Sequence, residues 1–372
     1  MRVIEKIEVW AVGPDVPRTT WASMPPQYMT MVVVRITDSD GAQGFGGTQS
    51  YAAGQFDLAV YEATKTLAAR LIGTEAGRVE ESWQRLQTYV LPATPGSVAV
   101  LDVALWDLEA KRAGVPLYRL LGGARRKALA YASTPELADI PAYFEHVDGL
   151  IEAGFRAIKF HAWNVPERDL EMLRAVHNRF NGQGITFMHD AENRYDRRNA
   201  LTVARELEEM GFRWFEAPLI DYDVEGYVDL RRRVHIPIVP HGLWMTDLVQ
   251  LRHALMLQPW DVVRFDVTNA GGFTLGRKMC ALAEAFGLPV ELQSWGYSLI
   301  QAANLHLELA VDRQSYFELP VPYDAYEFGV IHPYRLDADG YVSASDEPGL
   351  GVDVDWAALT KAQLSHSVVR IR

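Results

Sequence analysis

The sequence predicts an α/β protein in which an eight-stranded β/α barrel follows a smaller N-terminal lobe. The first indication is the length, because 372 residues exceed what one ordinary hydrophobic core accommodates. The second is a rhythm beyond residue 123, where short apolar or β-branched runs recur every roughly 23 to 30 residues with helix-like stretches between them. A parallel sheet covered by helices on both faces would give a similar rhythm and is the alternative.

The N-terminal part indicates a hairpin followed by helices. The stretch MTMVVVRITDSDGAQGFGG has an apolar run, a DSDG turn and a glycine-rich return, which is a hairpin pattern. Helical periodicity follows around residues 58–71, 79–89 and 98–113. VPLYRLLGG then ends in paired glycines that stop the helix. We therefore place a domain boundary at Gly123, which makes residues 1–123 the first domain.

Eight predicted strands define the barrel, which is expected to span residues 124–320. They are ALAYAS, RAIKFHA, ITFMHD, FRWFEA, IPIVPHG, VVRFDV, PVELQSW and SYFELP. Residues 321–372 are rich in turns and short strands. This last segment is expected to return and pack on the first domain.

Composition argues against several kinds of partner. A formal net charge of −12 would repel nucleic acid and anionic membranes. The opening MRVIEKIEVWAV is too charged for a secretory leader, and no apolar run approaches the ~20 residues of a membrane span. The single cysteine, Cys280, excludes an intramolecular disulfide and lies in a helical pattern typical of a buried structural thiol. We therefore expect a cytoplasmic protein without nucleic-acid or membrane partners.

Polar side chains stand at the C-terminal ends of seven successive predicted strands. In a parallel barrel these ends meet at one mouth, so residues far apart in sequence share a site. Any one of them alone indicates a helix cap or a surface charge. Seven in succession predict a functional site, because a barrel gains no stability from charges crowded at its mouth. The residues are Lys159 and His161, then Asp190, Glu216, His241, Asp266, Gln293 and Glu318.

Two pairs among these residues indicate a chemistry. Lys159 and His161 are two apart on a strand, so they project to one side, and two nitrogen bases suit proton abstraction. A lysine paired to a nearby carboxylate is the structural alternative. Asp190 and Glu216 end adjacent strands and are hard oxygen ligands of the kind that Mg²⁺ prefers. A divalent cation is thus the expected cofactor.

Two long motifs resemble one family. SVAVLDVALWDLEAKRAGVPLYRLLGG, residues 97–123, and FDVTNAGGFTLGRKMCALAEAFGLPV, from Phe265, are similar to stretches of the enolase superfamily, in its mandelate racemase and muconate lactonizing enzyme branch. The resemblance covers nearly the whole chain. It implies a modified (β/α)8 barrel of the (β/α)7β type, closed by an N-terminal α+β capping domain that C-terminal residues complete. It also implies a homo-oligomer that removes the α-proton of a small carboxylate substrate while a metal stabilises the enolate.

The resemblance assigns roles by position. Lys159 and His161 match the family's Lys-x-Lys or Lys-x-His pair, which makes them catalytic candidates. Asp190 and Glu216 match the first two metal ligands. Two further catalytic candidates are the acid of a His-Asp dyad and a carboxyl near the substrate carboxylate, namely Asp266 and Glu318.

This chain departs from the family pattern at two places. The third metal ligand is usually a glutamate, but here Gly242 takes that place, with His241 before it. Gln293 replaces the dyad histidine, and glutamine cannot carry a proton. Racemisation needs competent groups on both faces of the α-carbon, so we favour β-elimination of water from a hydroxy acid, an aldonate or aldarate. The alternatives are a cycloisomerase or epimerase using the same enolate, and a ligand-binding relative without activity.

The metal shell and the substrate contacts are left open by these departures. His241, water or Glu192 would complete the shell, and a histidine ligand would shift the preference from Mg²⁺ toward Mn²⁺, Fe²⁺ or Zn²⁺. Glu192 and Gln293 are also candidates for substrate binding. Family specificity is attributed to capping-domain loops, here residues 17–28 and 48–56, where Trp21 and Tyr28 would suit a polyol. Packing within the hairpin is the alternative for these two aromatic side chains.

Overall fold

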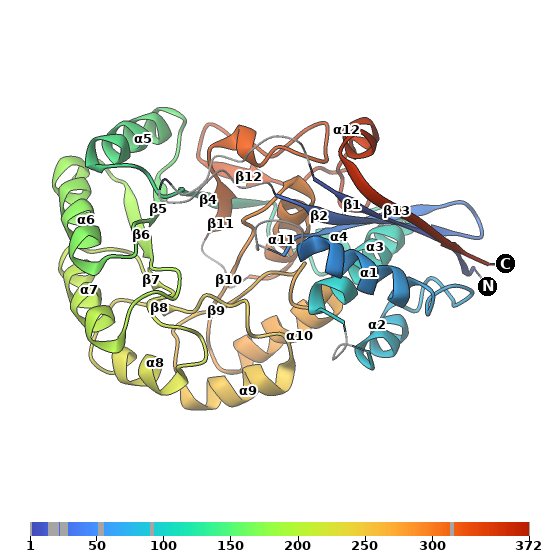
Figure 1. The fold of residues 1–372 in the computed structure, drawn as a ribbon, viewed down its shortest axis with the longest axis horizontal. Helices are drawn as coiled ribbons and strands as arrows, with labels where there is room; N and C mark the ends of the chain where they lie inside the picture. Colours follow the sequence, from blue (N-terminus) through green and yellow to red (C-terminus); the bar gives the residue numbers. More distant parts are fainter. Residues whose placement is uncertain are drawn as a thin grey trace.

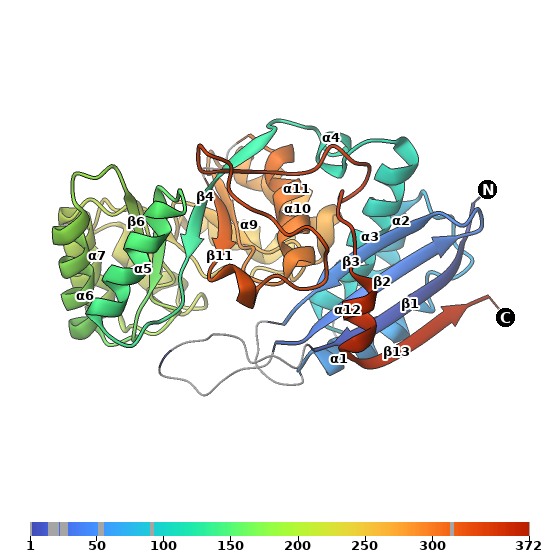
Figure 2. The same ribbon diagram turned by 90° about the horizontal axis from the view of Figure 1, so that it is seen from above.

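A computed structural model describes residues 2–13, 22, 29–50, 56–89, 93–312 and 316–371, which form a sheet-and-helix cap beside a barrel (Figure 1). The cap sheet is antiparallel with strand order β13-β1-β2-β3. The last strand of the chain pairs with the first, so both ends of the chain lie in one sheet (Figure 2). The strands are β1 (Ile4–Val12), β2 (Met31–Asp38), β3 (Gln43–Thr48) and β13 (Gln363–Arg370).

One long buried helix holds the cap together. Thr94 caps the N-terminus of α3 by accepting a hydrogen bond from Ser97, and Gly114 ends the helix in a left-handed conformation. The predicted glycine-rich return strand lies flush on this helix, because a Cβ at Gly44 would come within 2.1 Å of the Ala104 carbonyl oxygen. The hairpin glycines therefore serve close packing. The helices are α1 (Phe56–Ala68), α2 (Val79–Gln87), α3 (Pro95–Ala113) and α4 (Leu117–Leu120).

All eight predicted barrel strands are present, and they are parallel. Six follow the order β11-β4-β5-β6-β7-β8, and β9 pairs with β10. The strands are β4 (Lys127–Ser133), β5 (Ala157–His161), β6 (Thr186–Asp190), β7 (Phe215–Glu216), β8 (Ile238–Val239), β9 (Val263–Phe265), β10 (Val290–Leu292) and β11 (Phe317–Pro320). The helices around them are α5 (Ile140–Glu152), α6 (Pro166–Phe180), α7 (Arg197–Glu209), α8 (Val224–Arg231), α9 (Leu248–Leu257), α10 (Gly272–Ala285) and α11 (Ser298–Ala310).

Alternation along β5 decides which side chains reach the barrel interior. Phe160 packs in the large apolar cluster between strands and helices, whereas Ala157 belongs to a smaller cluster inside the barrel. Because successive side chains of a strand point to opposite faces, Lys159 and His161 share the inward face with Ala157. The predicted common direction of the two bases is confirmed.

The C-terminal segment crosses from the barrel to the cap. It contains a 3₁₀ turn, η1 (Tyr323–Ala325), then β12 (Tyr341–Ser343), which pairs with β4, then α12 (Trp356–Lys361) before β13. The domain boundary at Gly123 stays a prediction. Cys280 is buried, as expected, and burial raises the pKa of its thiol to about 12. Within the described ranges, every helix is too short or too polar to cross a lipid bilayer.

A buried carboxylate fastens the cap to the barrel. Asp102 on α3 accepts hydrogen bonds from the backbone N–H of Thr274 at 3.0 Å and from its hydroxyl at 2.6 Å, across to α10. Nearby, the indole N–H of Trp83 donates to the carbonyl of Gly271, and that of Trp106 donates to the Thr274 hydroxyl. The cap is thus held directly against the helix that follows β9.

Replacing Asp102 with alanine is expected to lower the free energy of unfolding by about 1–3 kcal/mol, because the buried Thr274 N–H loses its acceptor. Urea denaturation of the full chain measures this loss. The control is Asp148→Ala, which removes an exposed ion pair with Arg179 and should cost less than about 1 kcal/mol. Equal losses in the two variants would contradict the role given to Asp102.

Candidate active site

A cavity of about 320 Å³ lies at the C-terminal ends of the barrel strands. Size and position are typical of a small-molecule site in a barrel enzyme. Its lining brings together seven of the residues predicted from the strand ends and the loop after β6, namely Lys159, His161, Asp190, Glu192, His241, Gln293 and Glu318. Ser50, Leu243 and Trp295 complete the lining.

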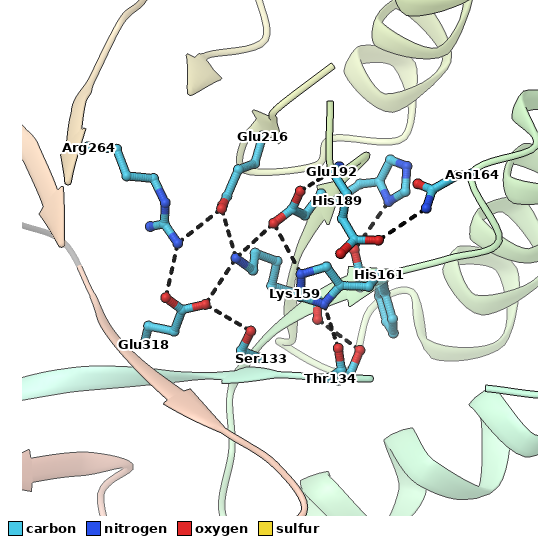
Figure 3. Close-up of polar contacts among 12 residues, drawn as sticks. Ser133, Thr134, Lys159, His161, Asn164, His189, Glu192, Glu216, Arg264 and Glu318 are labelled. Carbon is cyan, nitrogen blue, oxygen red and sulfur yellow. Dashed lines mark hydrogen bonds and ion pairs between the residues drawn. The ribbon is translucent and has the colours of Figure 1, made fainter. Parts of the chain in front are cut away.

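Lys159 stands at the centre of a buried carboxylate cluster (Figure 3). Its Nζ lies 3.1 Å from Asp190 Oδ2, 2.8 Å from Glu216 Oε1 and 3.1 Å from Glu318 Oε1. Burial alone would lower the pKa of the ammonium, but Glu216 and Glu318 raise it well above its ordinary value. These ion pairs favour the charged form of Lys159, whereas a lysine base needs a lowered pKa. The predicted catalytic role of Lys159 stays a prediction.

His161 is held at both ring nitrogens. Nδ1 lies 2.5 Å from the carbonyl oxygen of Thr134, and Nε2 lies 3.1 Å from Asp190 Oδ2. Burial lowers the pKa of the imidazole, but Asp190 outweighs that effect and raises it. Both partners are acceptors, so the ring is poised to carry and release a proton at the cavity wall. These are the properties of a general acid–base group.

Sequence reasoning missed Arg264, which lies inside the barrel on β9. Its Nη2 is 3.0 Å from Glu216 Oε1 and 3.0 Å from Glu318 Oε2 (Figure 3). The pKa of Glu318, which burial would raise, is lowered to about 2 by Lys159 and Arg264. The available signal was the charged residue within the run VVRFDV. Side chains two apart on a strand point to the same face, so Arg264 shares the face of Asp266, which was predicted to point into the barrel.

The side chain of Asp221 fixes the backbone of the loop after β8. Asp221 accepts hydrogen bonds from the backbone N–H groups of His241 at 2.9 Å and Gly242 at 2.7 Å. Gly242 has φ 85°, and a Cβ there would lie 2.3 Å from the carbonyl oxygen of Arg264. No residue with a side chain fits this backbone without rearrangement. His241 lines the cavity, and its Nδ1 has no hydrogen-bond partner among the described residues.

Gln293 and Asp266 have different surroundings. Gln293 lines the cavity, is 8% exposed, and its Oε1 has no hydrogen-bond partner in the described part of the chain. Asp266 is instead enclosed by its own loop, where it accepts hydrogen bonds from Thr268, Asn269 and Asn304. Asp266 is not among the described residues that line the cavity. Its catalytic role stays a prediction, and the geometry gives it a structural role in holding the loop after β9.

The cap supplies one described residue to the cavity, Ser50, near the start of the loop at residues 48–56 that is predicted to set specificity. Thr48 anchors that loop, because its hydroxyl donates to the carbonyl of Thr268 at 2.7 Å. Glu192 also lines the cavity and accepts a hydrogen bond from Asn164 at 3.0 Å. Trp21 and Tyr28 lie outside the described residues, so their predicted substrate contacts stay predictions.

Comparison with known proteins identifies the family. The model of the mandelate racemase/muconate lactonizing enzyme N-terminal domain matches residues 6–122, and the model of the enolase C-terminal domain-like family matches residues 142–358. The chain belongs to the mandelate racemase/muconate lactonizing enzyme branch of the enolase superfamily. Its cap and (β/α)7β barrel are the fold of that superfamily, as the sequence predicted.

Several relatives are named as enzymes acting on acid sugars. The 3,6-anhydro-alpha-L-galactonate cycloisomerase of Streptomyces coelicolor is 31% identical, over 88% of this chain and 90% of that protein. The L-talarate/galactarate dehydratase of Salmonella typhimurium is 27% identical, over 94% of this chain and 87% of that protein. A crystal structure from Pseudovibrio sp., described as a mandelate racemase/muconate lactonizing enzyme, is 36% identical with a TM-score of 0.96, and the match covers all of both chains. The family evidence supports an enzyme of lyase or isomerase type.

Magnesium is bound in the crystal structure of a Streptomyces coelicolor racemase that is 27% identical to this chain with a TM-score of 0.86, matched over 97% of this chain and all of that one. The donor set of this chain does not fit the family's three-carboxylate site. Asp190 and Glu216 meet, but Lys159 bridges them, and Gly242 offers no donor. Among the described residues, no three His, Cys, Asp or Glu side chains are arranged to hold an ion.

Proposed function

We propose that this protein removes the proton next to the carboxylate of a hydroxy acid and then eliminates water, with an aldonate or aldarate as substrate. One observation carries the proposal: His161 and Lys159 face a single cavity lined by polar groups at the barrel mouth. Acid-sugar dehydratases among the relatives support this substrate class.

In this mechanism His161 performs both proton transfers. In its neutral form the ring takes the α-proton, and the electron pair of the broken C–H bond moves toward the carboxylate. The ring then returns the proton to the departing β-hydroxyl, so water leaves and an enol remains, which tautomerises to a keto-deoxy acid. Lys159 supplies fixed positive charge near the developing enolate.

Gln293 supports elimination over racemisation. It occupies the wall where a second base would stand, and its unpartnered Oε1 is available to accept a hydrogen bond from a substrate hydroxyl. Glutamine binds and orients but transfers no proton. Of the two positions from which the family's paired bases act, only that of His161 then holds a side chain able to carry a proton.

The proposal is tested by incubating the protein with a library of sugar acids and following each mixture by mass spectrometry. A product lighter by one water is the expected result for at least one aldonate or aldarate. The same screen in deuterated water detects α-proton exchange. Absence of both water loss and exchange for every acid, with several divalent metals present in parallel, would contradict the proposal and favour a ligand-binding protein.

Cycloisomerisation is the second candidate. The observation in its favour is the 31% identity to a cycloisomerase, which exceeds the identity to the dehydratase. Both reactions would begin with proton removal by His161. A product of unchanged mass but altered ring structure, detected by NMR, would establish the isomerase.

The predicted Mg²⁺ cofactor and the homo-oligomeric state stay predictions. The carboxylates that would hold a divalent ion are Asp190 and Glu216, and Mg²⁺ is able to bind through one or two carboxylates completed by water. A bound metal would supply charge stabilisation for the enolate. Because the present donor arrangement does not fit, no step of the mechanism is assigned to a metal.

A further inference from the structure

Arg264 is a fully buried cation whose place in the barrel needs an explanation. Its side chain has no solvent exposure and is not among the described residues lining the cavity. Nε and Nη1 have no hydrogen-bond partner among the described residues, so the guanidinium is held through Nη2, by Glu216, Glu318 and the Tyr131 hydroxyl. Burying a guanidinium is costly unless it neutralises nearby carboxylates. The contacts of Arg264 therefore indicate a role as a counterion.

The carboxylate oxygens of this cluster already have donors. Glu216 Oε1 faces both Lys159 and Arg264, and Oε2 accepts from the indole of Trp214 at 3.2 Å. Glu318 accepts from the Ser133 hydroxyl at 2.8 Å and from the backbone N–H of Ser294 at 3.0 Å, besides its two ion pairs. A metal ion would have to displace these groups to gain ligands.

Both the charges of the cluster and the backbone at Gly242 disfavour the binding of a divalent ion. Three carboxylates, from Asp190, Glu216 and Glu318, face the two basic side chains Lys159 and Arg264. Each carboxylate lies within 3.1 Å of one or both of these basic groups, so a divalent ion would meet positive charge beside each of them. The third family ligand position is closed as well, because Gly242 leaves no room for a side chain against the carbonyl of Arg264.

We propose that Arg264 is the resident cation of this site, so that its guanidinium, together with Lys159, neutralises Glu216 and Glu318 and keeps divalent metals from binding. This inference concerns the charge of the site and does not depend on the substrate proposed above. The guanidinium of Arg264 on β9 then supplies positive charge in place of a dissociable metal ion.

The test is a titration of the full chain with Mn²⁺, followed by electron paramagnetic resonance without substrate. The unaltered protein is expected to show no saturable Mn²⁺ binding at millimolar concentration. Arg264→Gln removes the cation and is expected to bind Mn²⁺ at least about tenfold more tightly. The double variant Arg264→Gln, Asp190→Asn should lose the gained site. The control Arg231→Gln breaks an ion pair with Asp261 outside the cavity and should gain nothing.

Two results would overturn the proposal. One is saturable Mn²⁺ binding by the unaltered protein at millimolar concentration. The other is the absence of Mn²⁺ binding in a folded Arg264→Gln variant, which would show that Arg264 is not what excludes the metal. If that variant fails to fold, the thermal unfolding temperature of the unaltered protein is measured with Mn²⁺ and with a chelator. An unfolding temperature that neither addition changes supports the proposal, and an unfolding temperature that Mn²⁺ raises refutes it. Since no substrate is used, failure of the sugar-acid screen would leave these outcomes unaffected.

Discussion

Replacing His161 with asparagine is expected to reduce α-proton exchange and turnover by about 10²–10⁴-fold, the usual contribution of a general acid–base group. Asparagine still offers an amide N–H to the carbonyl of Thr134 but has no group that takes up a proton. Lys159 does not substitute, because its carboxylate neighbours hold it in the charged form. Exchange of the α-proton in deuterated water, followed by NMR, measures the loss, and calorimetry shows whether the substrate still binds.

The matched control is His189→Asn on the adjacent strand. His189 is also buried, but its ring stacks on Phe215 and faces the Tyr195 hydroxyl, away from the cavity. This variant is expected to lose stability while the folded fraction keeps its exchange rate. If His161→Asn retained exchange within about tenfold of the unaltered protein, another group would have to be the base.

The sequence was sufficient to predict the barrel and its mouth, because both follow from local rules. Strand spacing determined the number of β/α units, and the ends of parallel strands meet at one face. Alternation along β5 placed Lys159 and His161 on one side, and the structure places both in the cavity. These predictions needed no knowledge of which strands pair or how they tilt.

Strand alternation indicates that Arg264 points inward, but its partners could not be predicted, because they depend on the packing of β7, β9 and β11 across the barrel interior. The three strands are separated in sequence, and only the closed barrel brings Arg264 within 3.0 Å of both Glu216 and Glu318. Asp266 also has contacts that the strand pattern does not encode. It directly follows β9, and residues of its own loop together with Asn304 donate hydrogen bonds to its carboxylate oxygens.

Replacing Lys159 with methionine is expected to lower the free energy of unfolding by about 3–5 kcal/mol, because removing one partner of a buried ion pair leaves uncompensated charge. Lys159 is 1% exposed, and three carboxylates surround it. Methionine fills a similar volume but carries no charge. Urea denaturation near neutral pH measures the loss. The control Lys278→Met removes a partly exposed pair with Glu80 and should cost less than about 1 kcal/mol.

At lower pH, the free energies of unfolding of the Lys159→Met variant and the unaltered protein should differ by less. In the unaltered protein, burial would raise the pKa values of Asp190 and Glu318, but Lys159 lowers both, so their stabilising contribution is present above about pH 4 and is lost as the pH falls. Without the ammonium, burial raises those pKa values, and the folded variant takes up protons that relieve the repulsion. The loss measured at about pH 5 should therefore be smaller than at about pH 7. A loss that grows on acidification would mean that Lys159 stabilises the barrel by packing and not by charge.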